Sequence, residues 1–206
     1  MIEFISRGGV FLIPIGALSI AALYLIIERA SFFLKSRPTS QVLVSLNRIL
    51  DNKDVEIIDD ALIGSPAPEA RLVNAGLQST FEETIDPRLR LDRTLISIVT
   101  ELEQNVAPLA AIANVATHLG LLGTVVGMIA AFIGMGGVAT ADMTGLTRGI
   151  SQALVTTAAG LGVAVPSSFF HHVYANYVRK RISELNVTFS ELESLLFTVP
   201  GDESQR

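Results

Sequence analysis

Residues 106–141 read VAPLAAIANVATHLGLLGTVVGMIAAFIGMGGVATA and contain no Asp, Glu, Lys or Arg. An uncharged apolar stretch of about 18 or more residues is typical of a transmembrane helix, because a helix rises about 1.5 Å per residue and the bilayer's hydrocarbon core is about 30 Å thick. This stretch is longer than a bilayer needs. We therefore expect its helix to begin in the cytoplasm and to end near Gly136 and Gly137 on the outer side.

Two further uncharged stretches flank it in sequence, at residues 9–27 (GVFLIPIGALSIAALYLII) and 149–178. A signal peptide would have a shorter apolar core preceded by basic residues, whereas here Arg29, Lys35 and Arg37 follow the first stretch. We therefore expect three retained spans.

The basic residues also predict an orientation. Arg29 follows the first span and Arg179, Lys180 and Arg181 follow the third, and cytoplasmic flanks of spans are enriched in such residues. The sequence thus predicts an external N-terminus, a cytoplasmic C-terminus and a hairpin of spans two and three. The expected segments are an external 1–8, spans at 9–27, 106–137 and 149–178, a cytoplasmic helical region at 28–105, a periplasmic loop at 138–148 and a cytoplasmic tail at 179–206.

The region between the first two spans has the pattern of helices. Apolar residues recur at helical spacing within 42–50 and again within 91–102, with a Gly-Ser-Pro-Ala-Pro break at 64–68. The second stripe, formed by Leu91, Leu95, Ile98 and Leu102, runs into span two, so we expect one continuous helix there. The predicted fold class is all-α.

Composition excludes several classes of function. The chain has 206 residues with a mean hydropathy of +0.50, no Cys, a net charge of -5 and 17% charged residues. Disulfides and thiolate metal sites are therefore not available, and the three His show no metal-ligand spacing. The sequence has no basic patch of the kind that binds nucleic acid. It also has no nucleophile, base and orienting acid in the spacing of a catalytic site. We expect neither an enzyme nor a cofactor.

Small and hydroxyl-bearing residues recur every three or four positions on one face of spans two and three, which favours close helix contact. In span two they are Thr117, Gly120, Thr124, Gly127 and Ala131, and in span three Ala153, Thr157, Gly160, Ala164 and Ser167. We assign helix packing to Gly120, Gly123, Gly127, Ala153, Gly160 and Ala164. Both stripes could be packing faces alone, or Thr124 and Thr157 could line an ion path.

A threonine hydroxyl can orient water or coordinate a cation, but it cannot carry a proton as a charge near neutral pH. The three spans contain no Asp, Glu, Lys or Arg, although an ion relay within a membrane normally uses such a group. His118 lies deeper in a span than His171 and His172, and either packing or a relay would suit it. If ions cross here, another chain is expected to bring the charged carrier.

Two motifs resemble a known family. Residues 118–132 read HLGLLGTVVGMIAAF and residues 150–166 read ISQALVTTAAGLGVAVP. They are similar to the second- and third-span motifs of the MotA/TolQ/ExbB proton channel family, above all its ExbB/TolQ branch. The first span, with Pro14 inside it and Glu28-Arg29 closing it, also fits.

The resemblance implies a ring of subunits, thought to be five, around two copies of a partner similar to ExbD or TolR. Each partner would have one membrane helix whose aspartate takes up and releases the ion, surrounded by the ring's Thr124 and Thr157. The implied location is the bacterial inner membrane. The implied function is a stator subunit that couples ion flow to force at the periplasm or outer membrane, with a TonB-like or TolA-like protein beyond it.

Two positions differ from well-known family members. Gln152 replaces a glutamate, so a proton-handling role for that position is in doubt, although an amide can still form hydrogen bonds. Thr117 replaces a proline. Thr156 adds a hydroxyl beside Thr157, so sodium stays open as the coupling ion, although the proton is favoured. The residues expected to line the ion path are Thr124, Thr157, Thr117, Thr156 and Gln152.

The system that such a subunit would power is not specified by the sequence. TonB-type transport energisation is the leading hypothesis, and TolQ-like envelope maintenance or a gliding motor is the alternative. A helical membrane scaffold that conducts no ions is the competing hypothesis from another class.

Overall fold

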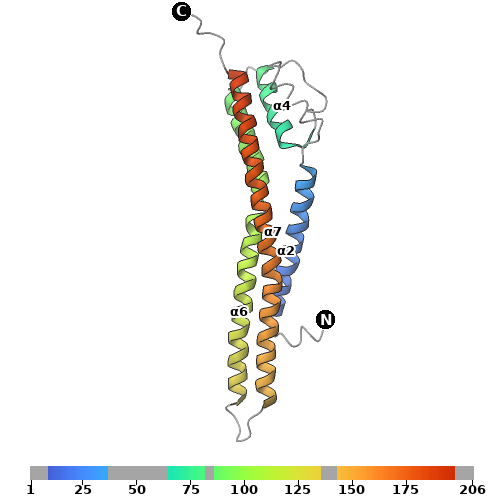
Figure 1. The fold of residues 1–206 in the computed structure, drawn as a ribbon, viewed down its shortest axis with the longest axis vertical. Coiled ribbons are helices and arrows are strands. Elements are labelled where there is room, and N and C mark those ends of the chain that lie inside the picture. The colour runs from blue at the N-terminus through green and yellow to red at the C-terminus, as the bar shows by residue number, and fades with distance from the viewer. Residues whose placement is uncertain (1–8, 37–64, 82–85, 136–142, 198–206) are drawn as a thin grey trace, which may run out of the picture. The chain divides into compact units, whose positions relative to one another are not determined.

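The computed structural model describes residues 9–36, 65–81, 86–135 and 143–197. Within these ranges the secondary structure is helical, and Figure 1 shows the helices. They are α2 (Leu12–Lys35), α4 (Pro68–Phe81), α5 (Pro87–Glu103), α6 (Ala107–Met135) and α7 (Met143–Phe197). The helix expected within 42–50 lies outside the described residues.

Three helical stretches are long and apolar enough to cross a membrane, at Leu12–Lys35, Arg88–Ile133 and Met143–Ser194. The predicted all-helical fold with three candidate membrane spans is therefore confirmed.

The chain divides into two compact units, each described here by itself. The first contains residues 1–29 and 105–175, and the second contains residues 30–104 and 176–206. The first unit holds the apolar stretches of the three expected spans, and the second holds the expected cytoplasmic helices.

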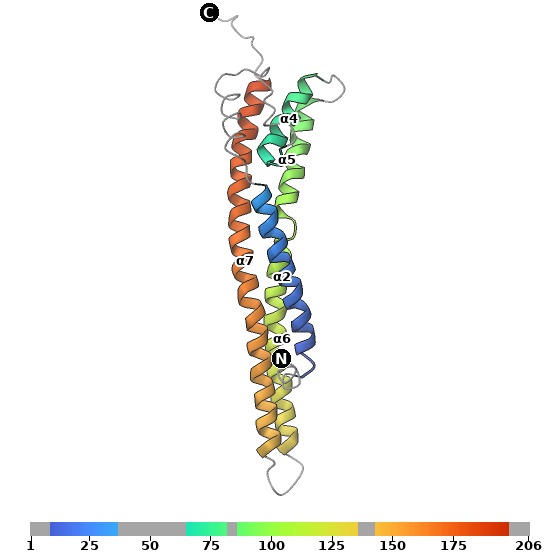
Figure 2. The same cartoon turned by 90° about the vertical axis from the view of Figure 1, so that its right-hand side faces the viewer.

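In the first unit, α6 and the first part of α7 form an antiparallel hairpin, and α2 lies beside them (Figures 1 and 2). The hairpin buries small residues: Ala116 is 0% and Ala131 1% exposed on α6, and Ala153 is 4% exposed on α7. Large apolar side chains such as Phe132 and Val165 face outward. This is the reverse of a soluble bundle and suits helices that meet lipid or other membrane helices.

In the second unit, α4 packs against α5. The apolar stripe expected on α5 is buried at Leu91, Ile98 and Leu102, while Leu95 is half-buried. These side chains belong to the unit's apolar core. Each contributes to stability, because burial of a leucine or isoleucine stabilises a fold by about 1.5–3 kcal/mol.

The expected continuous helix from the α5 stripe into span two is wrong. A turn at residues 104–106 separates α5 from α6, and Asn105 in it has φ of 58°. Pro108 explains the break, because proline lacks the N–H that would bond to the carbonyl of Gln104, and its ring would clash with that carbonyl. Asn is among the residues that best tolerate a positive φ.

The last helix is longer than the third span. It begins at Met143, so residues 143–148 are helical where a loop was expected, and it continues past Val178 to Phe197. At 55 residues, α7 is longer than a bilayer requires, and its extension into the cytoplasm stays a prediction. Pro166 lies inside it without ending it.

Candidate functional site: the α6–α7 hairpin and its polar ends

The backbones of α6 and α7 approach closely at Gly160. A Cβ at this position would lie 2.6 Å from the carbonyl oxygen of Ala116 and 2.9 Å from the Cα of Gly120. Real Cβ contacts are not this short, and backbone atoms cannot swing aside. Only glycine therefore fits at this crossing, as expected for small residues between membrane helices.

The same contact recurs further along the hairpin. A Cβ on Gly127 would lie 2.8 Å from the Cβ of Ala153, and one on Gly149 would lie 2.8 Å from the carbonyl oxygen of Gly127. Gly123 faces the side chain of Thr156 in the same way. At each of these positions the neighbouring helix leaves no room for a Cβ, and Gly149 is one that the sequence pattern did not single out.

Thr157 connects the two helices through its hydroxyl. Its Oγ1 donates a hydrogen bond to the carbonyl oxygen of Gly120 across the crossing, with an O···O distance of 3.0 Å. The hydroxyl oxygen keeps lone pairs that can accept from water or coordinate a cation.

The other threonines of the stripe bond within their own helix. Thr124 donates to the carbonyl of Leu121 at 2.6 Å, and Thr117 donates to that of Ala113 at 2.9 Å. Such back-bonding is common for threonine in helices and fixes the hydroxyl oxygen as an acceptor. Thr124 and Thr117 are both partly exposed in this chain.

Thr156 and Gln152 lie in different surroundings from Thr157. The side chain of Thr156 is only 1% exposed, packs at Gly123, and donates to the backbone carbonyl of Gln152 at 2.9 Å. The Gln152 side chain lies against Gly9, which has φ of 67° and leaves no room for a Cβ. Within the protomer these two side chains therefore pack the first unit, and their place on an ion path stays a prediction.

The first unit ends in a cluster of polar groups around Glu28. Arg29, with 1% exposure, has its Nε 3.3 Å from Oε2 of Glu28, and the Asn105 side-chain amide donates to the same oxygen at 3.4 Å. The amide of Asn105 thus holds the turn before α6 against α2. The sequence showed Glu28-Arg29 only as the end of span one, not that Arg29 is buried.

Two α7 side chains complete this end of the unit. The Tyr174 hydroxyl donates to the carbonyl of Ile26 at 2.9 Å, and Nδ1 of His171 lies 3.1 Å from the carbonyl of Val106. The carbonyl partner requires the proton on Nδ1. His118, in contrast, is exposed and its Nδ1 bonds to the carbonyl of Asn114 in its own helix. Among the residues that the structure describes, both histidines bond to backbone carbonyls and not to a carboxylate.

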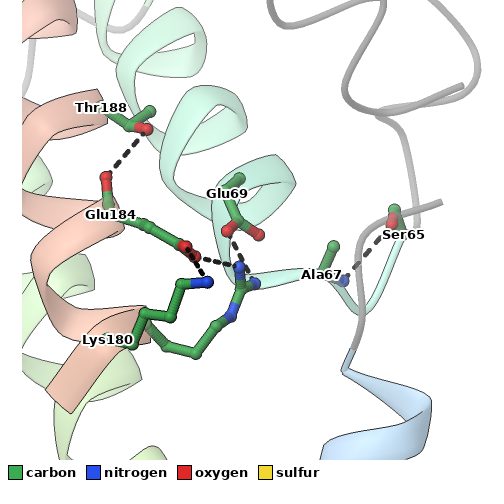
Figure 3. Close-up of polar contacts among 7 residues, drawn as sticks. Ser65, Ala67, Glu69, Lys180, Glu184 and Thr188 are labelled. Atoms are coloured by element: carbon green, nitrogen blue, oxygen red, sulfur yellow. Dashed lines mark hydrogen bonds and ion pairs between the residues drawn. The ribbon is translucent and has the colours of Figure 1, made fainter. Parts of the chain in front are cut away.

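In the second unit, an ion pair joins α4 to α7. Glu69 and Arg181 have side chains 5% and 10% exposed, and Oε1 of Glu69 lies 2.6 Å from Nη2 of Arg181. Glu184 accepts a second bond from Arg181 at 2.8 Å, and Lys180 lies 3.9 Å from Glu184 (Figure 3). A pair this buried needs both partners, because either charge alone would be left in a medium that solvates it poorly.

A second pair joins α4 to α5. Arg71 donates two hydrogen bonds to the carboxylate of Glu101, at 2.6 and 3.0 Å. This bond lowers the pKa of Glu101 below its ordinary value and raises that of Arg71. Within the described ranges, no group of three or more His, Asp or Glu could hold a metal ion.

Comparison with known proteins finds relatives that match much of the chain. A relative from Synechocystis sp. named biopolymer transport protein ExbB-like 3 is 29% identical over 196 residues, which cover 90% of each chain. A second one, ExbB-like 1, is 30% identical over 203 residues, 93% of this chain and 76% of its own. The Tol-Pal system protein TolQ of Haemophilus influenzae is 39% identical over 69 residues, 34% of this chain and 30% of its own.

The family model for MotA/TolQ/ExbB proton channels matches residues 65–187, which is more than half of the chain. These relatives are channel and transport proteins and not enzymes, as the sequence predicted. This chain belongs to the MotA/TolQ/ExbB proton channel family.

Proposed function

We propose that the chain is the ring-forming subunit of a proton-driven motor in the bacterial inner membrane. A partner of the ExbD or TolR type would supply the carboxylate that takes up and releases the proton. The observation that carries this proposal is the hydroxyl of Thr157, placed at a helix crossing without charged residues and bonded to the Gly120 carbonyl.

The hairpin has the chemistry to surround a carboxylate but not to replace it. An ionised aspartate in hydrocarbon is costly unless donors or water accompany it. Threonine hydroxyls from several copies of the chain, together with the water they hold, would lower that cost without trapping the proton. Thr124 and Thr157 are proposed to face the partner, with Thr117, Thr156 and Gln152 nearer the path's edge or packed behind it.

The energy available suits a mechanical step. One proton that crosses a potential of 100 mV releases about 2.3 kcal/mol, so a few protons can drive a change between two arrangements of the ring and its partner. Because the protomer offers no acid in its spans, proton transfer would occur on the partner while this chain supplies the polar wall.

We place the N-terminus and the loop at 138–148 in the periplasm, and residues 28–105 and 179–206 in the cytoplasm. A pentamer around two partner helices is the proposed assembly. The proposed output is energy for TonB-type transport, which the names of the ExbB-like relatives favour. The TolQ relative supports envelope maintenance, or a gliding motor of similar build, as the second candidate.

Co-expression with the neighbouring reading frame, followed by mass measurement of the complex in detergent, tests the proposal. The expected result is a complex with several copies of this chain and a smaller number of a single-span partner that carries an aspartate in its span. Recovery of this chain alone, with no bound polypeptide under conditions that preserve its own oligomer, would favour a scaffold that conducts no ions.

A further inference from the structure

A cleft lined by three arginines lies on the second unit. Its volume is about 230 Å³, and it is lined by Arg71 of α4 and by Arg90, Arg93, Thr94 and Ser97 of α5. The α5 residues are spaced by three, one and three positions, so they form one face of that helix. Packing of α4 on α5 brings the third guanidinium to the same face.

This concentration of positive charge has no role in holding the apolar core. Leu91, Ile98 and Leu102 lie on the buried side of α5, whereas Arg93 is exposed and Arg90 is half-buried. Several guanidinium groups around one hollow attract an anion more strongly than a single group does.

The carboxylate of Glu101 contacts this group of arginines through Arg71. Glu101 takes two hydrogen bonds from Arg71 and a longer one, at 3.4 Å, from the Ser97 hydroxyl. An arginine has five N–H donors in a planar fork, so one that holds a carboxylate keeps donors for a second anion. The Arg71–Glu101 pair therefore fixes the guanidinium in place at the wall of the cleft.

We propose that this cleft binds a phosphate group. Guanidinium groups match tetrahedral oxyanions through paired N–H···O bonds, and a dianion gains more than a monovalent ion from several arginines. The cleft volume of about 230 Å³ accommodates a phosphate with part of its hydration shell. The site does not rest on the proposed motor function.

The phosphate could be free in the cytoplasm, as inorganic phosphate or a small phosphate ester, or it could belong to a lipid headgroup. The test below distinguishes the two sources.

The test is calorimetric titration of inorganic phosphate into the full-length protein in neutral-lipid nanodiscs, in a buffer without phosphate or sulfate. We expect saturable binding of one phosphate per chain. Arg93→Gln should weaken it at least about tenfold, because one charge-assisted contact is lost. Arg179→Gln, the same charge change at an exposed α7 position outside the cleft, should leave binding within about twofold.

Arg93 is exposed, so its variant should keep the helix content and melting temperature of the wild type, and both are measured alongside. Equal weakening in the two variants, or no saturable binding to the wild type, overturns the site. Repetition in nanodiscs that contain phosphatidylglycerol identifies the source. Unchanged phosphate binding indicates a free phosphate, and phosphate binding that the anionic lipid abolishes indicates a headgroup.

Discussion

Replacement of Thr157 by valine separates the packing role of this residue from its proposed role in ion movement. Valine keeps the branched shape of the side chain and removes the hydroxyl, which donates to the Gly120 carbonyl at 3.0 Å. Serine keeps the hydroxyl and removes the methyl group. The two variants therefore change opposite halves of the same side chain.

The structural cost of the valine variant should be small. Side-chain hydrogen bonds between membrane helices contribute about 0.6 kcal/mol on average in double-mutant cycles and about 1–2 kcal/mol in model peptides. The Gly120 carbonyl also remains within the regular hydrogen-bonding of α6, so the change does not leave it without a donor. Assembly and helix content should stay close to those of the wild type.

The functional cost should be larger. If the hydroxyl oxygen stabilises a moving ion or its water, the contribution is that of a hydrogen bond to a charged group, about 1.5–3 kcal/mol. Loss of this stabilisation in the rate-limiting transition state would slow proton flux roughly 10- to 150-fold.

The assay is proton uptake into proteoliposomes that contain this chain and its partner, with a fluorescent pH indicator inside. We expect Thr157→Val to lose flux, Thr157→Ser to keep most of it, and all three proteins to form the same complex by mass. A valine variant that assembles normally and conducts at the wild-type rate would refute the ion-path assignment and leave Thr157 as a packing residue.

Three further predictions concern stability. Gly160→Ala should separate α6 from α7 and lower the melting temperature of the detergent-solubilised protein, whereas Gly162→Ala, where a Cβ meets nothing within 4 Å, should leave it unchanged or slightly raise it. Arg181→Met should cost about 3–5 kcal/mol in denaturant unfolding, because it leaves the buried charge of Glu69 without its cation, and the double change with Glu69→Leu should recover much of the loss. The arginine that binds Glu101 lowers the pKa of this carboxylate. Glu101 therefore stabilises the fold above its unfolded-state pKa and loses that effect as the pH falls through its folded-state pKa. We expect Glu101→Gln to flatten the decline of melting temperature below about pH 5.

Each of these has a result that contradicts it. Equal melting temperatures for the two glycine variants would mean that the helices do not cross as closely as described. Failure of the Glu69 change to recover stability would show that Arg181 acts through contacts other than this pair. An unaltered acid decline in the Glu101 variant would assign that decline to other carboxylates, and the expected change is small in any case because the Glu101 side chain is 42% exposed.

The sequence predicts what depends on local pattern. Three spans, the antiparallel hairpin and the small-residue faces all follow from charge-free runs and residue spacing, as does the buried stripe on α5. Pro108 marks the break before span two, but the apolar periodicity on either side of it predicts a continuous helix. The sequence-based prediction followed the periodicity and was wrong.

Contacts between distant residues could not be predicted in the same way. The Glu69–Arg181 pair joins residues on different helices, and nothing in the neighbouring residues of either distinguishes it from an ordinary exposed charge. The contact of Gln152 with Gly9 depends on how α2 lies against α7. In both cases the partner is chosen by tertiary packing and not by sequence spacing.

Proton flux through proteoliposomes that contain this chain without any partner tests the central claim most directly. The spans have polar walls but no titrating acid, so we predict flux no greater than that of empty vesicles, with conduction restored by a partner that carries its membrane aspartate. Partner-free vesicles that conduct protons at a rate comparable to the complex would contradict the claim that the carboxylate comes from another polypeptide.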